Sequence, residues 1–381
     1  MTPPHGSRGT VAGFTAFGIL WGGWAGLVPE VQEAVGASKG ELGLALLFVG
    51  VGSVPAMLLA GPAINRRGPR VMPVALLALA VAAILPAFAA SVATLALALL
   101  AVGAASGAVD VAINVAAADY EARTRQRLMH LAHGFFSIGV VVGALGAGLL
   151  RQAGAGRVPV LATVAGALAL AALINRRQPA RDGHLPAARF RLRPRIVALG
   201  AACGAAFMIE GGIENWSALY LERDLDATPA LSAFGPGAYA LAMVLGRLLG
   251  QRLGVLANDR TLLGGGALLS LAGLIVAAAA PGVAVAVAGF FLAGAGVSVA
   301  APALFGAAGR SVGAEERGSA VATVTTLGYL GFLVGPPLVG ASAAALGLAV
   351  SFLLLAVVAA TLAAATPALR LEGAHPAEAR G

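Results

Sequence analysis

The amino-acid sequence predicts an all-α polytopic membrane protein with 12 transmembrane helices in two pseudo-symmetric six-helix bundles. Three observations lead to this fold class. The chain of 381 residues is 59% hydrophobic and only 11% charged, whereas soluble domains carry about 25% charged residues. Its apolar residues form long runs that are separated by short basic gaps. One basic stretch with several prolines divides these runs into two groups of six.

The apolar runs are long enough to span a membrane, since a transmembrane helix needs about 20 apolar residues. The first run follows Arg8 and is too long for the apolar core of a cleavable signal peptide, so we interpret it as an uncleaved first span. In order along the chain, the predicted spans are 10–30, 41–63, 71–90, 94–118, 129–150, 157–175, 196–221, 230–251, 261–280, 282–306, 317–342 and 346–367.

Glycine is abundant, with 53 residues, and recurs at a spacing that favours helix packing. Two glycines four positions apart lie on one helix face and allow two helix backbones to approach closely in lipid. We therefore expect close helix contacts at three such pairs, namely Gly103/Gly107, Gly139/Gly143 and Gly331/Gly335.

The basic residues indicate the orientation in the membrane. If both termini are cytoplasmic, 21 of the 25 arginine and lysine residues fall on the cytoplasmic side. The exceptions are Lys39, Arg151, Arg157 and Arg223, whereas Arg247, near the end of the eighth span, counts with the cytoplasmic group. Such an excess predicts cytoplasmic termini. We accordingly interpret the net charge of +8 as a topology signal and not as a nucleic-acid-binding surface.

Three regions are predicted: a six-helix bundle over 1–175, a basic cytoplasmic linker over 176–195, and a second six-helix bundle over 196–381. The linker is either an orientation signal or also a segment that binds anionic lipid headgroups. Similar stretches follow the second and eighth spans, AGPAINRRGPR (60–70) and GRLLGQRLG (246–254). Two matching halves are typical of transporters in which one half rocks against the other around a site at the membrane midplane.

Asp110 is the only charged residue in the apolar stretch 95–118, and Asn114 follows it on the same helix face. A charged side chain at the centre of a membrane helix costs roughly 2.5–3.5 kcal/mol on insertion scales. We interpret Asp110 as a binding or proton-carrying residue that faces a polar cavity. The alternative is a protonated acid that is hydrogen-bonded between packed helices.

Glu210 is the second candidate proton-coupling residue. At a rise of 1.5 Å per residue, Asp110 and Glu210 each lie within about 6 Å of the midpoint of their span. Burial disfavours the charged form of a carboxyl group, so such residues can gain and lose a proton during transport.

Glu214 shares a helix face with Glu210, but Trp216 lies about 120° away in a straight helix. Two interpretations remain open. Either the pair Gly211-Gly212 breaks the helix and brings Trp216 to the site, or Trp216 and Tyr220 belong to an outer aromatic belt. For Tyr220 we expect the belt.

The stretch after the second span resembles the signature loop of the major facilitator superfamily, of Gly-x-x-x-Asp-Arg-x-Gly-x-Arg type. Together with twelve spans and a basic central loop, this resemblance covers essentially the whole chain. It implies a cytoplasmic gating loop made of Gly61, Asn65, Arg66, Gly68 and Arg70, with Gln251 and Arg252 in the second copy. Asn65 stands where the family has Asp, so we expect a weaker gate unless Asp119 or Glu121 supplies the missing charge.

Further stretches are similar to a branch of this superfamily. The Asp110-x-x-x-Asn114 pattern and EGGIENWSALYL (210–221) resemble fucose-permease-like sugar/proton symporters. AHGFFSIG (132–139) and LGYLGFLVGPPLVG (327–340) look like YbjJ-type bacterial inner-membrane members. The chain departs from fucose permease because it has no acid deep in the first span. The resemblance implies a monomer in the bacterial cytoplasmic membrane, driven by the proton gradient without a cofactor.

Aromatic and amide side chains near the spans' midpoints suit a sugar-like or other small polar substrate. The predicted substrate-binding residues are Trp21, Asn114, His133, Glu214, Asn215 and Trp216. We expect the partners to be this substrate and the lipid bilayer, with no nucleic acid and no metal site at the pair His130 and His133.

The fourth span has no Arg and the fifth has no proline, unlike drug/proton antiporters of the superfamily, which favours uptake. Proton-coupled efflux is the alternative within transporters. A membrane receptor or an intramembrane enzyme is the alternative of another class.

Overall fold

A computed structural model describes residues 7–176, 192–253, 258–313, 316–369 and 371. Within these residues, the 12 predicted spans are confirmed as helices long and apolar enough to cross a membrane. The first six spans form the N-terminal half, α1 (Arg8–Ala34), α2 (Lys39–Arg67), α3 (Val71–Ile84), α4 (Val92–Thr124), α5 (Met129–Gln152) and α6 (Arg157–Asn175). Short 3₁₀ turns follow α2, as η1 (Gly68–Arg70), and α3, as η2 (Leu85–Phe88).

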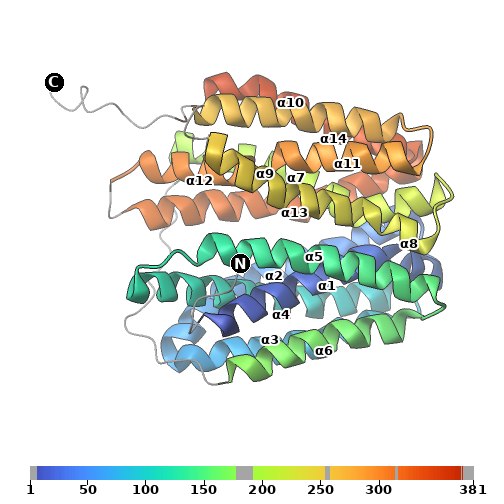
Figure 1. The fold of residues 1–381 in the computed structure, drawn as a ribbon, viewed down its shortest axis with the longest axis horizontal. Coiled ribbons are helices and arrows are strands. Elements are labelled where there is room, and N and C mark those ends of the chain that lie inside the picture. The colour runs from blue at the N-terminus through green and yellow to red at the C-terminus, as the bar shows by residue number, and fades with distance from the viewer. Residues whose placement is uncertain (1–6, 177–191, 254–257, 314–315, 370, 372–381) are drawn as a thin grey trace.

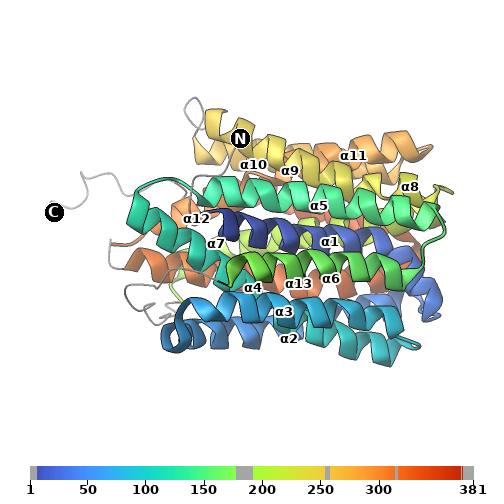
Figure 2. The same cartoon turned by 60° about the horizontal axis from the view of Figure 1, so that its bottom comes forward.

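The remaining spans form the C-terminal half, which packs beside the first half (Figure 1). Its elements are α7 (Pro194–Arg223), α8 (Pro229–Ser232), α9 (Phe234–Leu253), α10 (Asp259–Ala278), α11 (Val283–Val297), α12 (Ala300–Arg310), α13 (Arg317–Leu346), α14 (Leu348–Ala365) and η4 (Thr366–Ala368). All spans run roughly parallel or antiparallel to one another in both views (Figures 1 and 2). We call the end where α1 and α7 begin the proximal end, and the end where they stop the distal end.

Local sequence signals set the limits of α2. It starts at a capping box, in which the Ser38 hydroxyl accepts a hydrogen bond from the Glu41 amide and the Glu41 carboxylate accepts one from the Ser38 amide at 2.9 Å. It ends at Gly68, whose φ of 62° is a backbone conformation that glycine adopts without strain. Gly68 of the predicted gating loop therefore has a structural role as a helix terminator.

The seventh span is a continuous helix, and the interruptions lie in other spans. α7 runs unbroken from Pro194 to Arg223, so the interpretation in which Gly211-Gly212 breaks the helix is wrong. The interruptions lie instead in the eighth span, between α8 and α9, and in the tenth, between α11 and α12. Because α7 is a regular helix, Trp216 stays on a different face from Glu210.

Glycines permit the closest helix contacts, as predicted. Gly103 and Gly107 pack on the α2 backbone, Gly139 and Gly143 on the α1 backbone, and Gly331 and Gly335 on α7. A Cβ atom on Gly331 would overlap the carbonyl oxygen of Gly204, so only glycine fits there.

The two halves meet along five pairs of neighbouring helices, α2 with α13, α5 with α8 and α9, and α1 with α7 and α9. At the first pair, Gly43 lies against Gly340, where a Cβ atom on Gly43 would come within 2.8 Å of the Pro336 carbonyl oxygen. The halves thus approach through nearly bare backbones on one side.

Candidate functional site

Asp110 joins the two halves of the protein near the middle of the membrane spans. Its carboxylate oxygen Oδ2 accepts a hydrogen bond of 3.0 Å from the Tyr329 hydroxyl of α13. Its Oδ1 accepts one of 3.1 Å from the Asn114 amide, one helical turn further along α4. The Asn114 amide also donates to the Asp110 carbonyl oxygen at 2.8 Å, which holds the amide in this orientation. The predicted Asp110–Asn114 pair is therefore present, with a partner from the other half.

Tyr329 belongs to an aromatic cluster between α7 and α13. Phe207 and Phe332 stack with their ring centroids 4.7 Å apart, and Tyr329 lies 5.8 Å from Phe207. All three side chains remain partly exposed although they lie deep in their spans. The sequence gives no signal of this cluster, because phenylalanine and tyrosine in an apolar span can face either lipid or another helix.

Glu210 and Glu214 lie one turn apart on α7, and both are partly exposed. Within the described residues, neither carboxyl group has a hydrogen bond or an ion pair, in contrast to Asp110. Glu210 and Asp110 do not contact each other, but both interact electrostatically with Tyr329. The Tyr239 hydroxyl of α9 is buried and has no hydrogen-bond partner in the part of the chain that the structure describes. It interacts electrostatically with both glutamates.

Arg247 lies inside the membrane region, which corrects its assignment to the cytoplasmic group. Helix α9 includes 246–251, the end of the predicted eighth span, and continues to Leu253. The adjacent Gly246 packs against Ser298, close to the midpoint of the span Val283–Arg310. The guanidinium of Arg247 is the charged group that attracts the Glu210 carboxylate, and it repels a protonated His133. The sequence alone does not reveal how deep Arg247 lies, because an arginine near the end of a span is typical of an orientation signal.

The other predicted binding residues have separate surroundings. Trp21 is partly exposed and meets Phe17 edge-on, with ring centroids 6.2 Å apart. The His133 ring contacts the Phe14 ring, and the Ser137 hydroxyl donates to the His133 backbone carbonyl rather than to its ring. Asn215 accepts a hydrogen bond of 3.3 Å from the Trp24 indole, which links α7 to α1 across the two halves.

Trp216 and Tyr220 are core residues in this structure. Trp216 has no exposed surface, and its indole N–H has no hydrogen-bond partner in the described part of the chain. Tyr220 is 2% exposed and donates a hydrogen bond of 3.0 Å to the Ala277 carbonyl oxygen. The expected placement of Tyr220 in an outer aromatic belt is therefore wrong, because its polar group is satisfied inside the bundle.

The predicted gating loop is largely the end of a helix. Asn65 and Arg66 lie in the last turn of α2, and Arg70 closes η1. Glu121 forms no ion pair with these arginines within the described residues, and its Oε1 accepts hydrogen bonds from the Leu128 and Met129 amides at 2.6 and 2.8 Å. The side chains of Gln251 and Arg252, like most of the predicted linker 176–195, lie outside the described residues.

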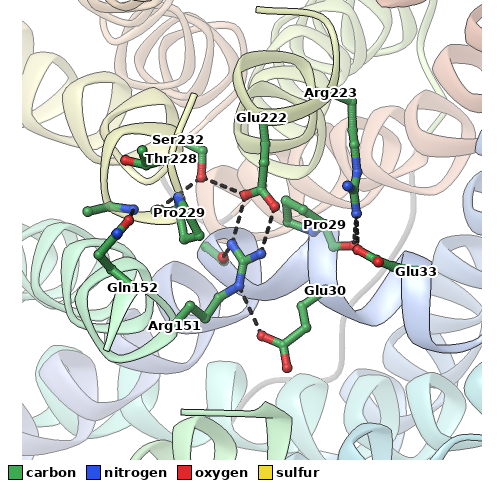
Figure 3. Close-up of polar contacts among 12 residues, drawn as sticks. Pro29, Glu30, Glu33, Arg151, Gln152, Glu222, Arg223, Thr228, Pro229 and Ser232 are labelled. Carbon is green, nitrogen blue, oxygen red and sulfur yellow. Dashed lines mark hydrogen bonds and ion pairs between the residues drawn. The ribbon is translucent and has the colours of Figure 1, made fainter. Parts of the chain in front are cut away.

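An ionic network joins the two halves at the distal end. Arg151 of α5 forms two hydrogen bonds with the Glu222 carboxylate of α7, at 2.8 and 2.9 Å (Figure 3). Its Nε donates to Glu30 of α1 at 3.0 Å, and Nη1 donates to the Gly26 carbonyl oxygen. We call Arg151, Glu30 and Glu222 the Arg151 network. Its central side chain is only 6% exposed, so solvent screens these charges weakly.

Further ion pairs join the halves around this network. Arg223 of α7 pairs with Glu33 and donates to the Pro29 carbonyl oxygen, both in α1 (Figure 3). Lys39 of α2 pairs with Asp224 at 3.2 Å. Three of the four basic residues that depart from the orientation pattern thus serve contacts between the halves. The fourth, Arg157, donates to the Ala89 carbonyl oxygen within the N-terminal half.

Comparisons with known proteins identify the relatives of this chain. The family model of the Major Facilitator Superfamily matches residues 10–254 and 204–380. An uncharacterized MFS-type transporter of Yersinia pestis is 35% identical over 363 residues, which cover 93% of this chain and 94% of that protein. The membrane protein MosC of Rhizobium meliloti is 30% identical, with 92% and 86% covered.

Solved structures share the fold at low sequence identity. A mutant of the nucleoside transporter NupG is 14% identical with a TM-score of 0.78, covering 95% of this chain and 99% of that chain. A bacterial homolog of the human lysosomal transporter Spinster, inward-facing and occupied, is 17% identical with a TM-score of 0.74 and 97% of each chain covered. A variant of the E. coli fucose:proton symporter FucP is 18% identical with a TM-score of 0.63, covering 95% and 98%.

Proposed function

The chain belongs to the major facilitator superfamily and is a multi-pass membrane transporter, and from this premise we propose that it moves a small polar solute together with protons. The solute is sugar-like or another small metabolite, and uptake into the bacterial cytoplasm across the inner membrane is the expected direction. Among the structural neighbours, the printed name of FucP describes a sugar/proton symporter.

The observation that carries the proposal is the hydrogen bond between Asp110 and Tyr329. It joins α4 of one half to α13 of the other at the membrane midplane. An ionised carboxylate accepts this bond more strongly than a neutral acid does. Protonation of Asp110 therefore weakens a contact that holds the halves together, and the proton becomes coupled to their relative movement.

The ion pairs at the distal end support a mechanism in which the site opens to one side of the membrane at a time. The Arg151 network and the pairs around it join the halves there. We propose that the distal end faces the outside and that the structure corresponds to an inward-facing state. The partly exposed residues Asp110, Glu210 and Glu214 then line the space that a substrate reaches from the cytoplasm.

Orientation can be tested by cysteine labelling in a Cys203→Ser background. Ala122 lies exposed at the proximal end of α4, and Ala153 lies exposed at the distal end of α5. In intact cells, a membrane-impermeant thiol reagent should label Ala153→Cys and should not label Ala122→Cys. The reverse pattern would contradict the proposal that both termini are cytoplasmic.

Transport can be tested in proteoliposomes that contain a pH-sensitive dye. Sugars, polyols, nucleosides and hydroxy acids are added outside one at a time. Symport predicts that at least one compound acidifies the lumen, because protons enter with it. Proton antiport would make the lumen alkaline with that compound. Binding without any counterflow of labelled compound would point to a receptor and contradict transport.

A further inference from the structure

Arg247 is a charged residue for which the proposed proton coupling gives no role. It is partly exposed near the membrane midplane, and no hydrogen bond or ion pair of its guanidinium exists within the described residues. An arginine keeps its charge in proteins, and a charge in the membrane interior is costly unless it is compensated. An unpaired guanidinium at this depth therefore calls for an anionic partner.

The groups around Arg247 leave its charge without a paired anion within the described residues. Glu210 on α7 attracts the guanidinium but lies beyond the 4.0 Å limit of an ion pair. His133 on α5 interacts electrostatically with Arg247 and contributes no negative charge. Tyr239, two turns earlier on α9, has a buried hydroxyl without a hydrogen-bond partner among the described residues. The Arg247 guanidinium and the Tyr239 hydroxyl can both donate hydrogen bonds to the oxygens of a carboxylate.

We propose that Arg247 binds a carboxylate group of the transported solute and that Tyr239 is a second donor to the same substrate. The substrate class is then a small hydroxylated carboxylic acid, such as a sugar acid or a hydroxy acid. This inference rests on the proposed transport function and specifies its substrate.

The same arrangement couples the anion to a proton. In the empty site the Glu210 carboxylate is the charge that attracts Arg247. When a substrate carboxylate occupies Arg247, Glu210 loses this attraction and has a second anion nearby. Its charged form is then disfavoured, and Glu210 takes up a proton from solution. One anion and one proton bind together, so the loaded site has the same net charge as the empty one.

No other ionisable group of the described neighbouring helices replaces Arg247 as the counter-charge of Glu210. α8, α11 and α14 contain no ionisable residue, and Arg310 at the end of α12 pairs with Asp259. Glu30 and Glu33 of α1 lie in the distal ion pairs. The groups that do interact with Glu210 are Cys203, Glu214, Tyr239, Arg247 and Tyr329.

The test uses purified full-length protein and thermal-shift titrations at constant ionic strength. Lactate, glycerate, gluconate and glucuronate are compared with the neutral glycerol, glucitol and glucose, and with the amine glucosamine. We expect at least one carboxylate to stabilise the protein more than its neutral counterpart. In Arg247→Gln its apparent Kd should rise by about tenfold or more, because charge-assisted hydrogen bonds are lost. Arg247→Lys should retain part of the affinity.

Arg260→Gln is the matched control, since it removes one positive charge from the exposed start of α10. It should leave the carboxylate affinity unchanged. A pH indicator in weakly buffered solution should record up to about one proton taken up per carboxylate bound. This uptake should disappear in Glu210→Gln.

Three outcomes would overturn the assignment: no carboxylate stabilises the protein, glucosamine does so instead, or Arg247→Gln binds the carboxylate as tightly as the wild type. If a neutral polyol still shows counterflow in any of these cases, the transport proposal stands without the anion site. If carboxylates bind through Arg247 but no compound shows counterflow, the anion site stands and the transport proposal fails.

Discussion

Asp110→Asn is expected to abolish proton-driven accumulation of substrate while exchange of substrate across the membrane continues. Asparagine keeps the shape of the protonated acid, and its oxygen can still accept the hydrogen bond from Tyr329. It cannot release a proton, so the contact with Tyr329 no longer ties the movement of the halves to the gradient. Proton uptake at Glu210 on substrate binding then does not by itself drive accumulation. A pH difference of one unit drives at most about tenfold accumulation in a one-to-one symporter, and the variant should reach a ratio of about one. Uptake and counterflow of labelled substrate in proteoliposomes measure the two activities separately.

Tyr329→Phe is the comparison variant for this experiment. It removes the bond between the halves and leaves the titratable carboxyl group in place. We expect accumulation to decrease without being lost, because a neutral partner contributes only about 0.5–1.5 kcal/mol to such a contact, or about 1.5–3 kcal/mol when a charge assists. If Asp110→Asn still accumulates substrate against its gradient, Asp110 is not the coupling residue.

Arg151→Gln is expected to open the distal end. The substitution leaves the Glu222 and Glu30 carboxylates near each other without their shared cation, on side chains that are 11% and 27% exposed. Removing one partner of a buried ion pair costs about 3–5 kcal/mol. Each 1.4 kcal/mol shifts a two-state balance by about tenfold. A cost of this size predicts that the ratio of outward-open to inward-open protein rises by about 100-fold or more.

Cysteine accessibility can measure this opening. Leu145 lies on α5 about 9 Å deeper than Arg151 by the helical rise, and it contacts Gly237 of the other half. In the Cys203→Ser background, Leu145→Cys should react much faster with an impermeant thiol reagent in intact cells when Arg151 is replaced. Adding Glu222→Gln should reverse part of the effect, because both members of the pair are then neutral.

Arg157→Gln is the matched control for the distal network. Arg157 lies at the same end of the bundle, but its contact with the Ala89 carbonyl oxygen stays within the N-terminal half. Its replacement should leave the labelling rate of Leu145→Cys unchanged. Equal rates in Arg151→Gln and in the wild type would show that the Arg151 network does not hold the distal end closed.

The sequence by itself determined the features that one segment carries alone. The twelve spans follow from hydropathy and length, and the six glycines of the three pairs mark close helix contacts that the structure contains. The Asp110–Asn114 contact was predictable because residues four positions apart meet on one helix face. These inferences needed only the regular geometry of a helix.

The tertiary structure alone decided which segments face each other. The Asp110–Tyr329 bond joins residues 219 positions apart, and Arg151 and Glu222 are 71 positions apart. By sequence, Arg247 is typical of an orientation signal, whereas in the structure the neighbouring Gly246 packs beside the middle of another span. In a soluble helix the polar face marks the solvent side. In a membrane both lipid and protein interior are apolar, so hydropathy does not tell which face of a helix turns inward.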